Sequence, residues 1–471
     1  MQSVTEWAQL NFGTCELGDK RRTKRLVILA EQLGSHPSGS LPHQISDWGD
    51  LKAGYRLFSQ EAVTFEAIAR PHWELTKRAA RGRCLVIGDT TEVDFGSQRQ
   101  IQGLGPTGNG SGQGFLLHNA LLVDAESEAI IGVAGQTIHY RPRKAKRKGR
   151  KNGKKPLKSK RENSAQILKR NRESEVWGTV IDQIGKPAEG VEYVHVFDRG
   201  ADNFEVYCRL IQNQSHWVIR ASRLNRDVLV GQSENPKKLS AFLKTLKTVG
   251  HYELDLRVRP DQPARAAQLE VRIGEVKIPR PKHVSPWVKS LQQAPIAMYV
   301  VEVVETNAPK DVTPIRWTLL TSLPVTSFEE AWVIIGYYEK RWLIEEYHKA
   351  LKTGCNVEKR QLKTADRLEA FVGLSSVTAV RLLQLKSLAR TNPDTPAAEV
   401  VPSVWLEMLK LARKKLLRVH ELTVGQFYRE VAKLGGFLGR KSDGEPGWIT
   451  IWRGWEKLNM FIYVASTLKT A

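Results

Sequence analysis

Cysteine is scarce in this sequence, with 4 in 471 residues. Cys15, Cys84, Cys208 and Cys355 stand far apart, and no CxxC pair or Cys/His cluster accompanies them. This spacing excludes a disulfide framework and gives no sign of a structural zinc site. We therefore expect reduced thiols, as in a cytoplasmic protein.

Long apolar runs and acidic residues are also in short supply. No run reaches the roughly 18 residues of a membrane-spanning helix, and the start, MQSVTEWAQLNFG, lacks a signal-peptide pattern. The 72 Lys and Arg outnumber the 50 Asp and Glu, which gives a formal net charge of +22. Because these cations are spread along the chain, one disordered arm does not explain the excess. A polyanion, most simply nucleic acid, is the expected partner, ahead of a membrane surface.

Two stretches of biased composition stand out. The glycine-rich stretch GLGPTGNGSGQG (residues 103–114) contains a GxGxxG match. It does not open a helix and Pro106 interrupts it, so we interpret it as a mobile loop over a site and not as a nucleotide fingerprint. The run RPRKAKRKGRKNGKKPLKSKR (141–161) is too charged to pack alone. We expect it to be a nucleic-acid-binding arm.

The first 75 residues are predicted to be helical. Asp19 is placed to cap a helix through KRRTKRLVILAEQL. The first turns of this helix carry Lys20, Arg21, Arg22, Lys24 and Arg25. Cations there oppose the helix dipole, which favours contact with phosphate over an ordinary charged helix start.

Two short apolar strands are each predicted to end in an aspartate: CLVIG before Asp89 and VHVF before Asp198. A strand pair and a helix are predicted between them, so the order is βββαβ, as in ribonuclease-H-like folds. Adjacent strands would bring the two carboxylates side by side, where they repel unless cations neutralise them. Mg²⁺, a hard ion with oxygen ligands, suits such a pair. The simpler interpretation of each aspartate alone is a turn former.

A helix predicted over Ser327–Thr353 has one face that mixes acid and base. At about 100° per residue, Arg341, Glu345 and Lys352 fall within roughly 60° of Tyr338. Lys349 joins them, while the opposite face, predicted to be core, carries Trp332, Leu343, Ile344, Tyr347, Ala350 and Leu351. A solvated face with ion pairs such as Glu345–Lys349 is the simpler interpretation. The other is that Glu345 completes a two-metal site for phosphoryl transfer with the two aspartates.

The pattern YxxRxxxExxxxxxK, here Tyr338, Arg341, Glu345 and Lys352, resembles the signature of bacterial DDE transposases of the insertion-sequence-four family. Similar stretches run through nearly the whole chain: LGDKRRTKRL, DTT at 89–91, FDRGAD at 197–202, RWTLLTS at 316–322 and LGGFLGRKSDGEPGW at 434–448. The resemblance implies cut-and-paste transposition at inverted-repeat DNA ends, through strand nicking, hairpin formation and resolution, and strand transfer.

The resemblance also implies residue roles. Asp89, Asp198 and Glu345 would form the catalytic triad and hold two Mg²⁺ ions per site, with Mn²⁺ as a substitute. Tyr338, Arg341 and Lys352 would grip DNA phosphates, and Lys349 would assist.

Trp317 matches an aromatic on which the family stacks a base flipped from the duplex. The alternative is a core tryptophan in a strand. Arg220 matches a basic position that faces the active site.

The implied architecture is α/β. A ribonuclease-H-like core over 76–224 and 316–395 is interrupted by a β-strand insertion domain at 225–315. A helical DNA-end-binding region (1–75) and a helical dimerisation region (396–471) flank it. The implied partners are double-stranded DNA, as transposon ends and target, and a second copy of the chain in a synaptic complex. The implied location is the bacterial cytoplasm, at the nucleoid.

Three other functions fit part of the sequence. A non-catalytic DNA-binding transposition inhibitor is disfavoured by the intact triad and N-terminal region. A stand-alone DNA endonuclease of the same fold is disfavoured by the insertion and Trp317. A basic protein that binds RNA or a membrane leaves the acidic residues unexplained.

Overall fold

The structure is a computed structural model that describes residues 2–45, 47–98, 101–142, 175–256, 263–291, 294–440 and 443–470. Nearly all of the basic run at 141–161 therefore lies outside the described residues. The chain divides into two compact units. Unit 1 comprises Met1–Ala80, Thr90–Pro142 and Leu343–Ala471, and unit 2 comprises Arg81–Asp89 and Arg143–Trp342. The four-part division implied by the family resemblance stays a prediction.

Unit 1 begins with helices, as predicted: α1 (Val4–Phe12), α2 (Lys20–Ser35), α3 (Leu41–Gln44), α4 (Trp48–Leu57) and α5 (Phe65–Ala79). The Asp19 side chain accepts a hydrogen bond from the Arg21 N–H, which confirms the predicted cap of α2. Leu26, Leu29 and Leu33 form the buried stripe of this helix. The local capping and periodicity are therefore sufficient to explain how α2 begins and which face it buries.

The strands of unit 1 form an antiparallel pair, β3 (Gly112–Asp124) and β4 (Ile130–His139), as predicted. Part of the glycine-rich stretch was predicted wrongly as loop. Residues Gly105–Thr107 form strand β2, which pairs with β3. The pairing partner lies within the same stretch, so β2 and the start of β3 close a small hairpin.

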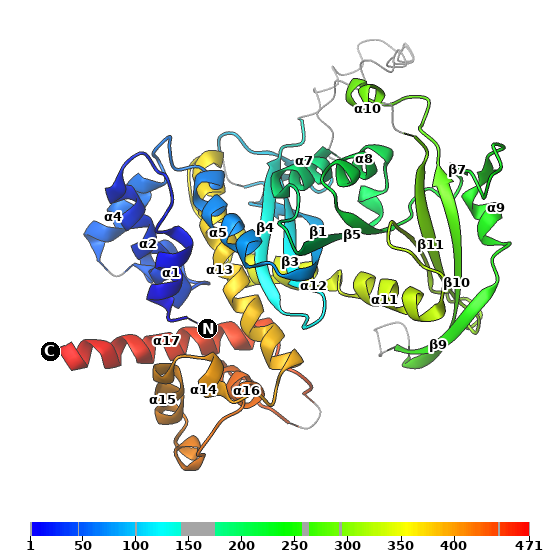
Figure 1. Cartoon of the computed structure of the whole chain (residues 1–471). Helices are drawn as coiled ribbons and strands as arrows, with labels where there is room; N and C mark the ends of the chain where they lie inside the picture. The colour runs from blue at the N-terminus through cyan, green and yellow to red at the C-terminus, as the bar shows by residue number, and fades with distance from the viewer. Residues whose placement is uncertain are drawn as a thin grey trace, which may run out of the picture. The chain divides into compact units, whose positions relative to one another are not determined.

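The centre of unit 1 is the long helix α13 (Ala365–Thr391). Among the described residues it is the one helix long and apolar enough to cross a membrane, yet most of it is buried within the protein, as a core helix is. It contacts α5 and β4 from the N-terminal part of the chain and α16 (Val424–Leu434) from the C-terminal part (Figure 1). The remaining C-terminal helices are α14 (Ala397–Val400), α15 (Ser403–Ala412) and α17 (Trp448–Thr470).

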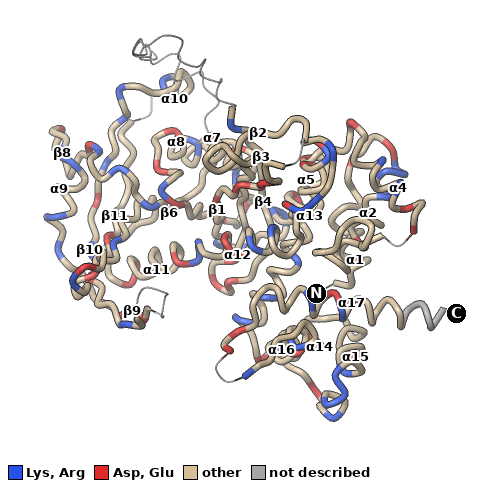
Figure 2. The backbone as a smooth tube through the Cα atoms, turned by 180° about the vertical axis from the view of Figure 1, so that it is seen from behind, with Lys and Arg blue, Asp and Glu red and all other residues tan. Residues whose placement is uncertain are grey.

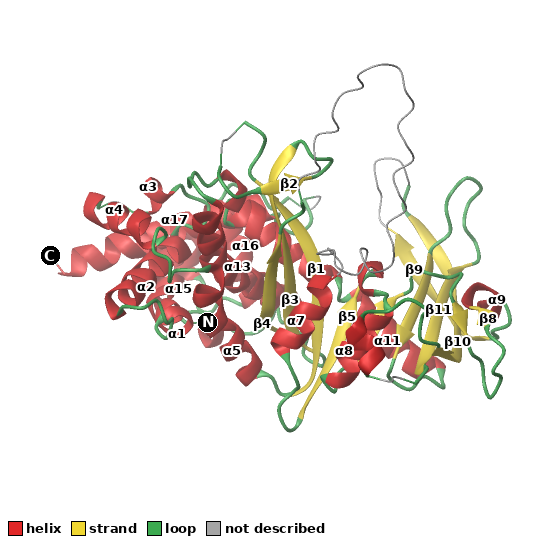
Figure 3. Ribbon diagram, turned by 90° about the horizontal axis from the view of Figure 1, so that it is seen from above, coloured by secondary structure: helices red, strands yellow, loops and turns green. Residues whose placement is uncertain are grey.

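Unit 2 is organised by a mixed sheet with the order β1-β5-β6-β12-β11-β10-β9. Its strands are β1 (Gly82–Asp94, of which residues to Asp89 belong to unit 2), β5 (Val191–Phe197), β6 (His216–Arg220), β9 (Thr248–Leu256), β10 (Arg265–Ile278), β11 (Ile296–Glu305) and β12 (Arg316–Thr321). β1, β5 and β6 are parallel, and the later pairs are antiparallel. The strands of the predicted insertion therefore continue the same sheet through β12 (Figure 3), and among the described residues only β7 (Asp227–Val228) and β8 (Lys237–Lys238) pair apart from it.

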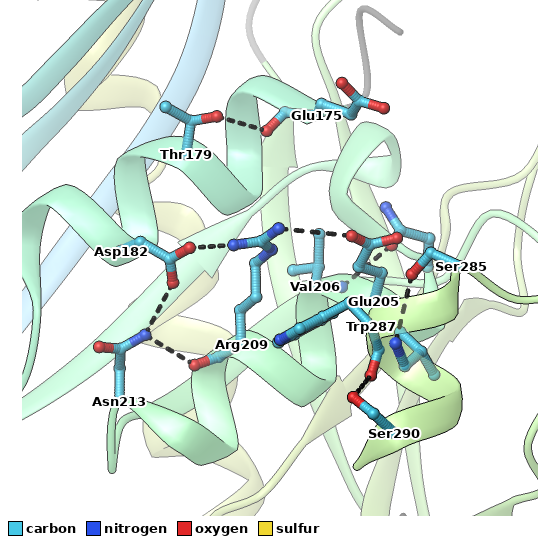
Figure 4. A network of polar contacts seen from close by, with 12 residues as sticks. Glu175, Thr179, Asp182, Glu205, Val206, Arg209, Asn213, Ser285, Trp287 and Ser290 are labelled. Carbon is cyan, nitrogen blue, oxygen red and sulfur yellow. Dashed lines mark hydrogen bonds and ion pairs between the residues drawn. The ribbon is translucent and has the colours of Figure 1, made fainter. Parts of the chain in front are cut away.

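The helices of unit 2 are α7 (Glu175–Ile184), α8 (Phe204–Gln212), α9 (Leu239–Leu243), α10 (Pro286–Ser290) and α11 (Phe328–Glu339). Arg209 of α8 joins three of them (Figure 4). It pairs with Asp182 of α7 and Glu205 of its own helix, and its guanidinium lies 4.6 Å from the centroid of the Trp287 ring in α10. This cation–π contact fixes the short α10 helix against the helical layer.

Two element boundaries near the predicted site differ from the predictions. The helix expected over Ser327–Thr353 is broken, because a turn closed by the Arg341 N–H and the Tyr338 carbonyl separates α11 from α12 (Trp342–Lys349). A π-helical turn, Ala350–Gly354, follows α12. The predicted faces change accordingly: Tyr338 is buried, and Trp332, assigned to the core, is 46% exposed. Strand β1 does not end at Asp89 but continues to Asp94.

Candidate functional site

The two aspartates singled out in the sequence are neighbours in the sheet of unit 2. β1 and β5 pair in parallel, and the last pair is Ile87 with Val196. Asp89 and Asp198 each lie two residues beyond that pair, so they share a level and a face. Neighbouring strands are about 4.8 Å apart. Two carboxylates are thus held close together on one surface of the sheet.

Local packing explains the residues that precede each aspartate. A Cβ atom at Gly88 would lie 2.5 Å from the Phe197 ring, so only glycine allows the two strands to approach there. Phe197 packs in turn on Trp177, with ring centroids 4.9 Å apart. The Asp198 carboxylate accepts a 2.8 Å hydrogen bond from the Gly200 N–H, which caps a short 3₁₀ turn and fixes the side chain.

A cation lies against the first aspartate. Nη1 of Arg341, in the turn between α11 and α12, is 3.1 Å from Oδ2 of Asp89. Both side chains are mostly buried, with exposed fractions of 18% and 21%. The guanidinium therefore offsets part of the repulsion between the two carboxylates.

Trp317 and Tyr338 pack together in unit 2. Their ring centroids are 5.9 Å apart in an edge-to-face arrangement. Trp317, at the start of β12, is half-buried, whereas Tyr338 is buried. The buried Tyr338 ring thus packs against the less buried Trp317 ring and restricts its movement. Arg220, predicted to face the site, ends β6 and donates a hydrogen bond to the Arg316 carbonyl.

Glu345 belongs to unit 1, on α12, and its side chain is half-buried. The predicted phosphate-binding lysines on the same segment have carboxylate partners: Lys349 pairs with Glu346 at 3.1 Å and Lys352 pairs with Glu358 at 3.0 Å. Glu346, the next residue, points about 100° away from Glu345 on the helix. Glu346 is buried and has cationic partners. The two consecutive glutamates in the sequence are the feature that could have drawn attention to it.

Ionisation of Glu346 depends on its partners. Burial opposes the charge, yet hydrogen bonds and charges from Lys386 and Lys349 outweigh burial and lower the Glu346 pKa to about 2. The carboxylate is therefore charged at neutral pH.

Three of the five cations at the start of α2 have internal partners. Arg21 pairs with Asp19, Arg25 pairs with Asp50, and Arg22 donates to the Leu17 carbonyl and the Gln60 side chain. Lys20 and Lys24 are exposed. The helix therefore presents Lys20, Lys24 and the ion-paired Arg21, whose side chain is 91% exposed, to solvent. Across the described residues, Lys and Arg occur along elements of both units (Figure 2).

A metal site can be tested against these residues. Within the described ranges, no three His, Cys, Asp or Glu side chains gather into a complete ligand cluster. The pair formed by Asp89 and Asp198 still offers carboxylate oxygens from one face, which is the donor set that hard divalent ions prefer. The two aspartates fit part of a divalent-metal site.

Comparison with protein families shows which kind of protein these residues belong to. Residues 4–63 match the family described as Transposase DNA-binding, residues 164–380 match Transposase DDE domain, and residues 377–470 match Transposase Tn5 dimerisation domain. These three matches follow one another along the chain in the order expected from the resemblance.

The chain belongs to the Tn5-like DDE transposases. It acts on DNA, and its DDE domain implies a ribonuclease-H-like core and dependence on divalent metal. The DDE match contains Asp198 and Glu345, whereas Asp89 lies before it. The DNA-binding match covers α1 to α4, and the dimerisation match runs from within α13 to α17, so the transposase binds DNA and forms dimers through named parts of unit 1.

Proposed function

We propose that this transposase moves a DNA segment by a cut-and-paste pathway at inverted-repeat ends. Water attack nicks one strand, and the freed 3′-hydroxyl attacks the opposite strand to form a hairpin. Hydrolysis reopens the hairpin, and the 3′ ends are joined to target DNA. The observation that supports this proposal best is the position of Asp89 and Asp198, each two residues beyond the last pair of the parallel strands β1 and β5, with Arg341 against Asp89.

Asp89, Asp198 and Glu345 are the proposed ligands of two Mg²⁺ ions, with Mn²⁺ as a substitute. When bound by these carboxylates, the ions would supply the activation of a water or a 3′-hydroxyl and the stabilisation of the leaving oxygen. The two aspartates are supported by their shared face on the sheet, and Glu345 by its place in the signature pattern. Arg341 orients the Asp89 carboxylate through their 3.1 Å contact.

The proposed DNA contacts draw on the residues around these acids. Arg341 offers a planar fork to phosphate, and Lys349 and Lys352 offer point charges. Because the two lysines are paired with Glu346 and Glu358, DNA phosphates would replace carboxylate partners there. Trp317, with Tyr338 behind it, offers a platform for an unstacked base. Arg220 and the helix start from Lys20 to Arg25 are proposed as further DNA contacts.

The proposed organisation of the chain follows the family pattern. Residues 1–75 bind the transposon end, 76–224 and 316–395 form the catalytic core, 225–315 form the insertion, and 396–471 pair two protomers in a synaptic complex. We further propose that the transposase acts on bacterial DNA in the cytoplasm, at the nucleoid.

Substitution of the three acids tests the proposal. Asp89→Ala, Asp198→Ala and Glu345→Ala should each abolish Mg²⁺-dependent cleavage of a DNA with inverted-repeat ends while leaving end binding intact. Glu234→Ala, at an exposed glutamate of unit 2, is the matched control and should cleave like the parent. Cleavage that persists in all three triad variants would refute the site.

The same reaction separates the proposal from the other functions of this fold. Pre-cut ends should be joined to a target plasmid by the parent chain, which a stand-alone endonuclease would not do. A transposition inhibitor would bind the ends and leave them uncut at every Mg²⁺ concentration.

A further inference from the structure

The carboxylate of Glu346 lies at a junction of three helices in unit 1. Glu346 itself is in α12, next to Glu345, and is 8% exposed. It accepts hydrogen bonds from Nζ of Lys386 in α13 and, at 3.0 Å, from the indole N–H of Trp448, the first residue of α17. Lys349 adds a second ammonium at 3.1 Å. A single buried carboxylate thus joins α12 to the core helix and to the C-terminal helix.

The two other members of this junction also contact each other. Nζ of Lys386 lies 4.1 Å from the centroid of the Trp448 ring, and Lys386 is itself 5% exposed. Trp448 stacks on Trp452, one turn along α17, with ring centroids 5.3 Å apart. The Trp452 ring fills the space beside Gly354, where a Cβ atom would lie 1.8 Å from it. Two tryptophans at the start of α17 therefore seat on the segment that carries Glu345 and on the π-helical turn after it.

The next two residues of α12 are held as well. The Tyr347 hydroxyl donates to the Ser376 carbonyl at 3.1 Å, and His348 is hydrogen-bonded to Asn119 at 3.0 Å. Since successive helical residues differ by about 100° in direction, contacts at three consecutive positions fix the rotation of the helix about its axis. That rotation sets where the Glu345 carboxylate points.

A buried ion pair is a costly way to hold two helices together, because apolar side chains of similar size often stabilise a fold as well or better. Charged partners instead restrict orientation. A carboxylate that accepts hydrogen bonds from both an ammonium and an indole N–H can adopt few other positions. At metal sites, partners of this kind behind the ligands set how those ligands are presented.

We propose that Glu346, together with Lys386 and Trp448, is a positioning residue for catalysis that holds α12 in the rotation at which Glu345 is presented to the metal ions. This inference rests on the proposed role of Glu345. It also means that the orientation of Glu345 depends on the start of α17, inside the range matched by the dimerisation family.

Two conservative substitutions test the inference in the full chain. Glu346→Gln keeps the shape but removes the charge, and Trp448→Phe keeps an aromatic ring but removes the N–H donor. Both should bind transposon ends like the parent, while the Mn²⁺ concentration for half-maximal single-turnover nicking rises about 10-fold. In the protein without metal or DNA, amide hydrogen exchange across 342–354 should become faster.

Glu430→Gln is the matched control. Glu430 is also a buried glutamate of unit 1 with cationic partners, Arg413 and Lys433, but it lies on α16. Its removal should lower thermal stability without changing the Mn²⁺ requirement or the exchange of 342–354. The double variant Glu346→Leu with Lys386→Met, which removes both charges, guards against misfolding of the single variants; it should melt close to the parent temperature and keep the raised Mn²⁺ requirement.

The outcomes separate the inference from the proposed function. If Glu345→Ala loses cleavage but the Glu346 and Trp448 variants match the parent in Mn²⁺ requirement and in hydrogen exchange, the positioning role is overturned and the active site stands. An equal effect of Glu430→Gln on the Mn²⁺ requirement would likewise overturn it. If Glu345→Ala still cleaves, the proposed role of Glu345 fails and the positioning role falls with it, whereas cleavage that persists in all three triad variants refutes the proposed site.

Discussion

The guanidinium of Arg341 lies 3.1 Å from the carboxylate of Asp89, although the two residues are 252 positions apart in the chain. The arginine thus occupies the place at this carboxylate that a divalent ion would compete for. It also lies in the turn that separates α11 from α12, so this contact links Asp89, within strand β1, to that turn.

Replacement of this arginine should have two opposite effects. Arg341→Ala should let Mn²⁺ bind the DNA-free protein more tightly, because no guanidinium competes for Asp89. The same change should lower cleavage at saturating metal about 100-fold, as loss of a charge-stabilising donor does. Calorimetric Mn²⁺ titration and single-turnover nicking measure the two effects, and Arg341→Lys should fall between. An unchanged Mn²⁺ affinity would argue against competition.

Trp317 should matter at one step more than at the others. Trp317→Ala should slow hairpin formation by about 10- to 100-fold, the range expected for loss of a base stack, and should affect the first nick much less. Denaturing gels resolve the nicked and hairpin products. Trp317→Phe retains a stacking surface and should recover much of the rate. Equal loss at both steps would count against base stacking.

The basic run 144–161 should act on DNA through charge alone. Replacing it with a Gly/Ser linker of equal length should flatten the plot of the logarithm of the binding constant against the logarithm of the salt concentration, because fewer counterions are released. Binding measured between low and physiological salt gives the slope. A slope identical to that of the parent would mean that this run stays off the DNA.

Stability should depend on pH through His72. This buried imidazole is hydrogen-bonded to Asn11 and accepts the Val133 N–H, and burial lowers its pKa to about 4. The unfolded chain, with an ordinary histidine pKa, binds the proton first as pH falls, so the free energy of unfolding should drop by about 1.4 kcal/mol per pH unit between roughly 6.5 and 4. Above that range the contribution is fully present.

Denaturant unfolding at pH 7 and pH 5 measures this dependence. His72→Gln removes the titrating group and should reduce the difference between the two pH values, at the cost of lower stability at pH 7. A parent protein equally stable at both pH values would contradict the assignment.

Gly88 should tolerate no side chain. Gly88→Ala would push on the Phe197 ring and thereby on the residue before Asp198, so it should lower stability by about 1–3 kcal/mol and reduce cleavage. Gly336→Ala, in α11 with open space around it, is the control and should be neutral or slightly stabilising. Thermal melting of the two variants measures this difference in stability. Similar melting temperatures for Gly88→Ala and Gly336→Ala would contradict the prediction.

Local signals in the sequence were enough to predict several elements. The cap at Asp19, the apolar run before Asp198 and the hairpin of β3 and β4 depend on neighbours in the chain, and each was found. The order β1, hairpin, helix, β5 followed from the same signals. The sequence alone therefore predicts the two aspartates on adjacent strands.

The features that the sequence did not predict depend on contacts between residues far apart in the chain. The segment YEKRWLIEEYHK has no glycine or proline to break a helix, yet the chain turns at Lys340 and Arg341, where Tyr338 is buried against Trp317 and Arg341 pairs with Asp89. Arg25 stays a predicted DNA contact, but its ion pair with Asp50 of another helix is one that no local pattern in the sequence indicates. Likewise, nothing local shows that β9 to β11 extend the core sheet.

The packing of α13 has a consequence for the synthesis of this protein. Its surface is covered by α5 and β4, which leave the ribosome early, and by α16, which leaves it near the end. When α13 has emerged from the ribosome but α16 has not, part of the apolar surface of α13 is exposed to solvent. Such a surface binds chaperones or leads to aggregation. Messages cut short before α16 should therefore yield insoluble product instead of a working fragment.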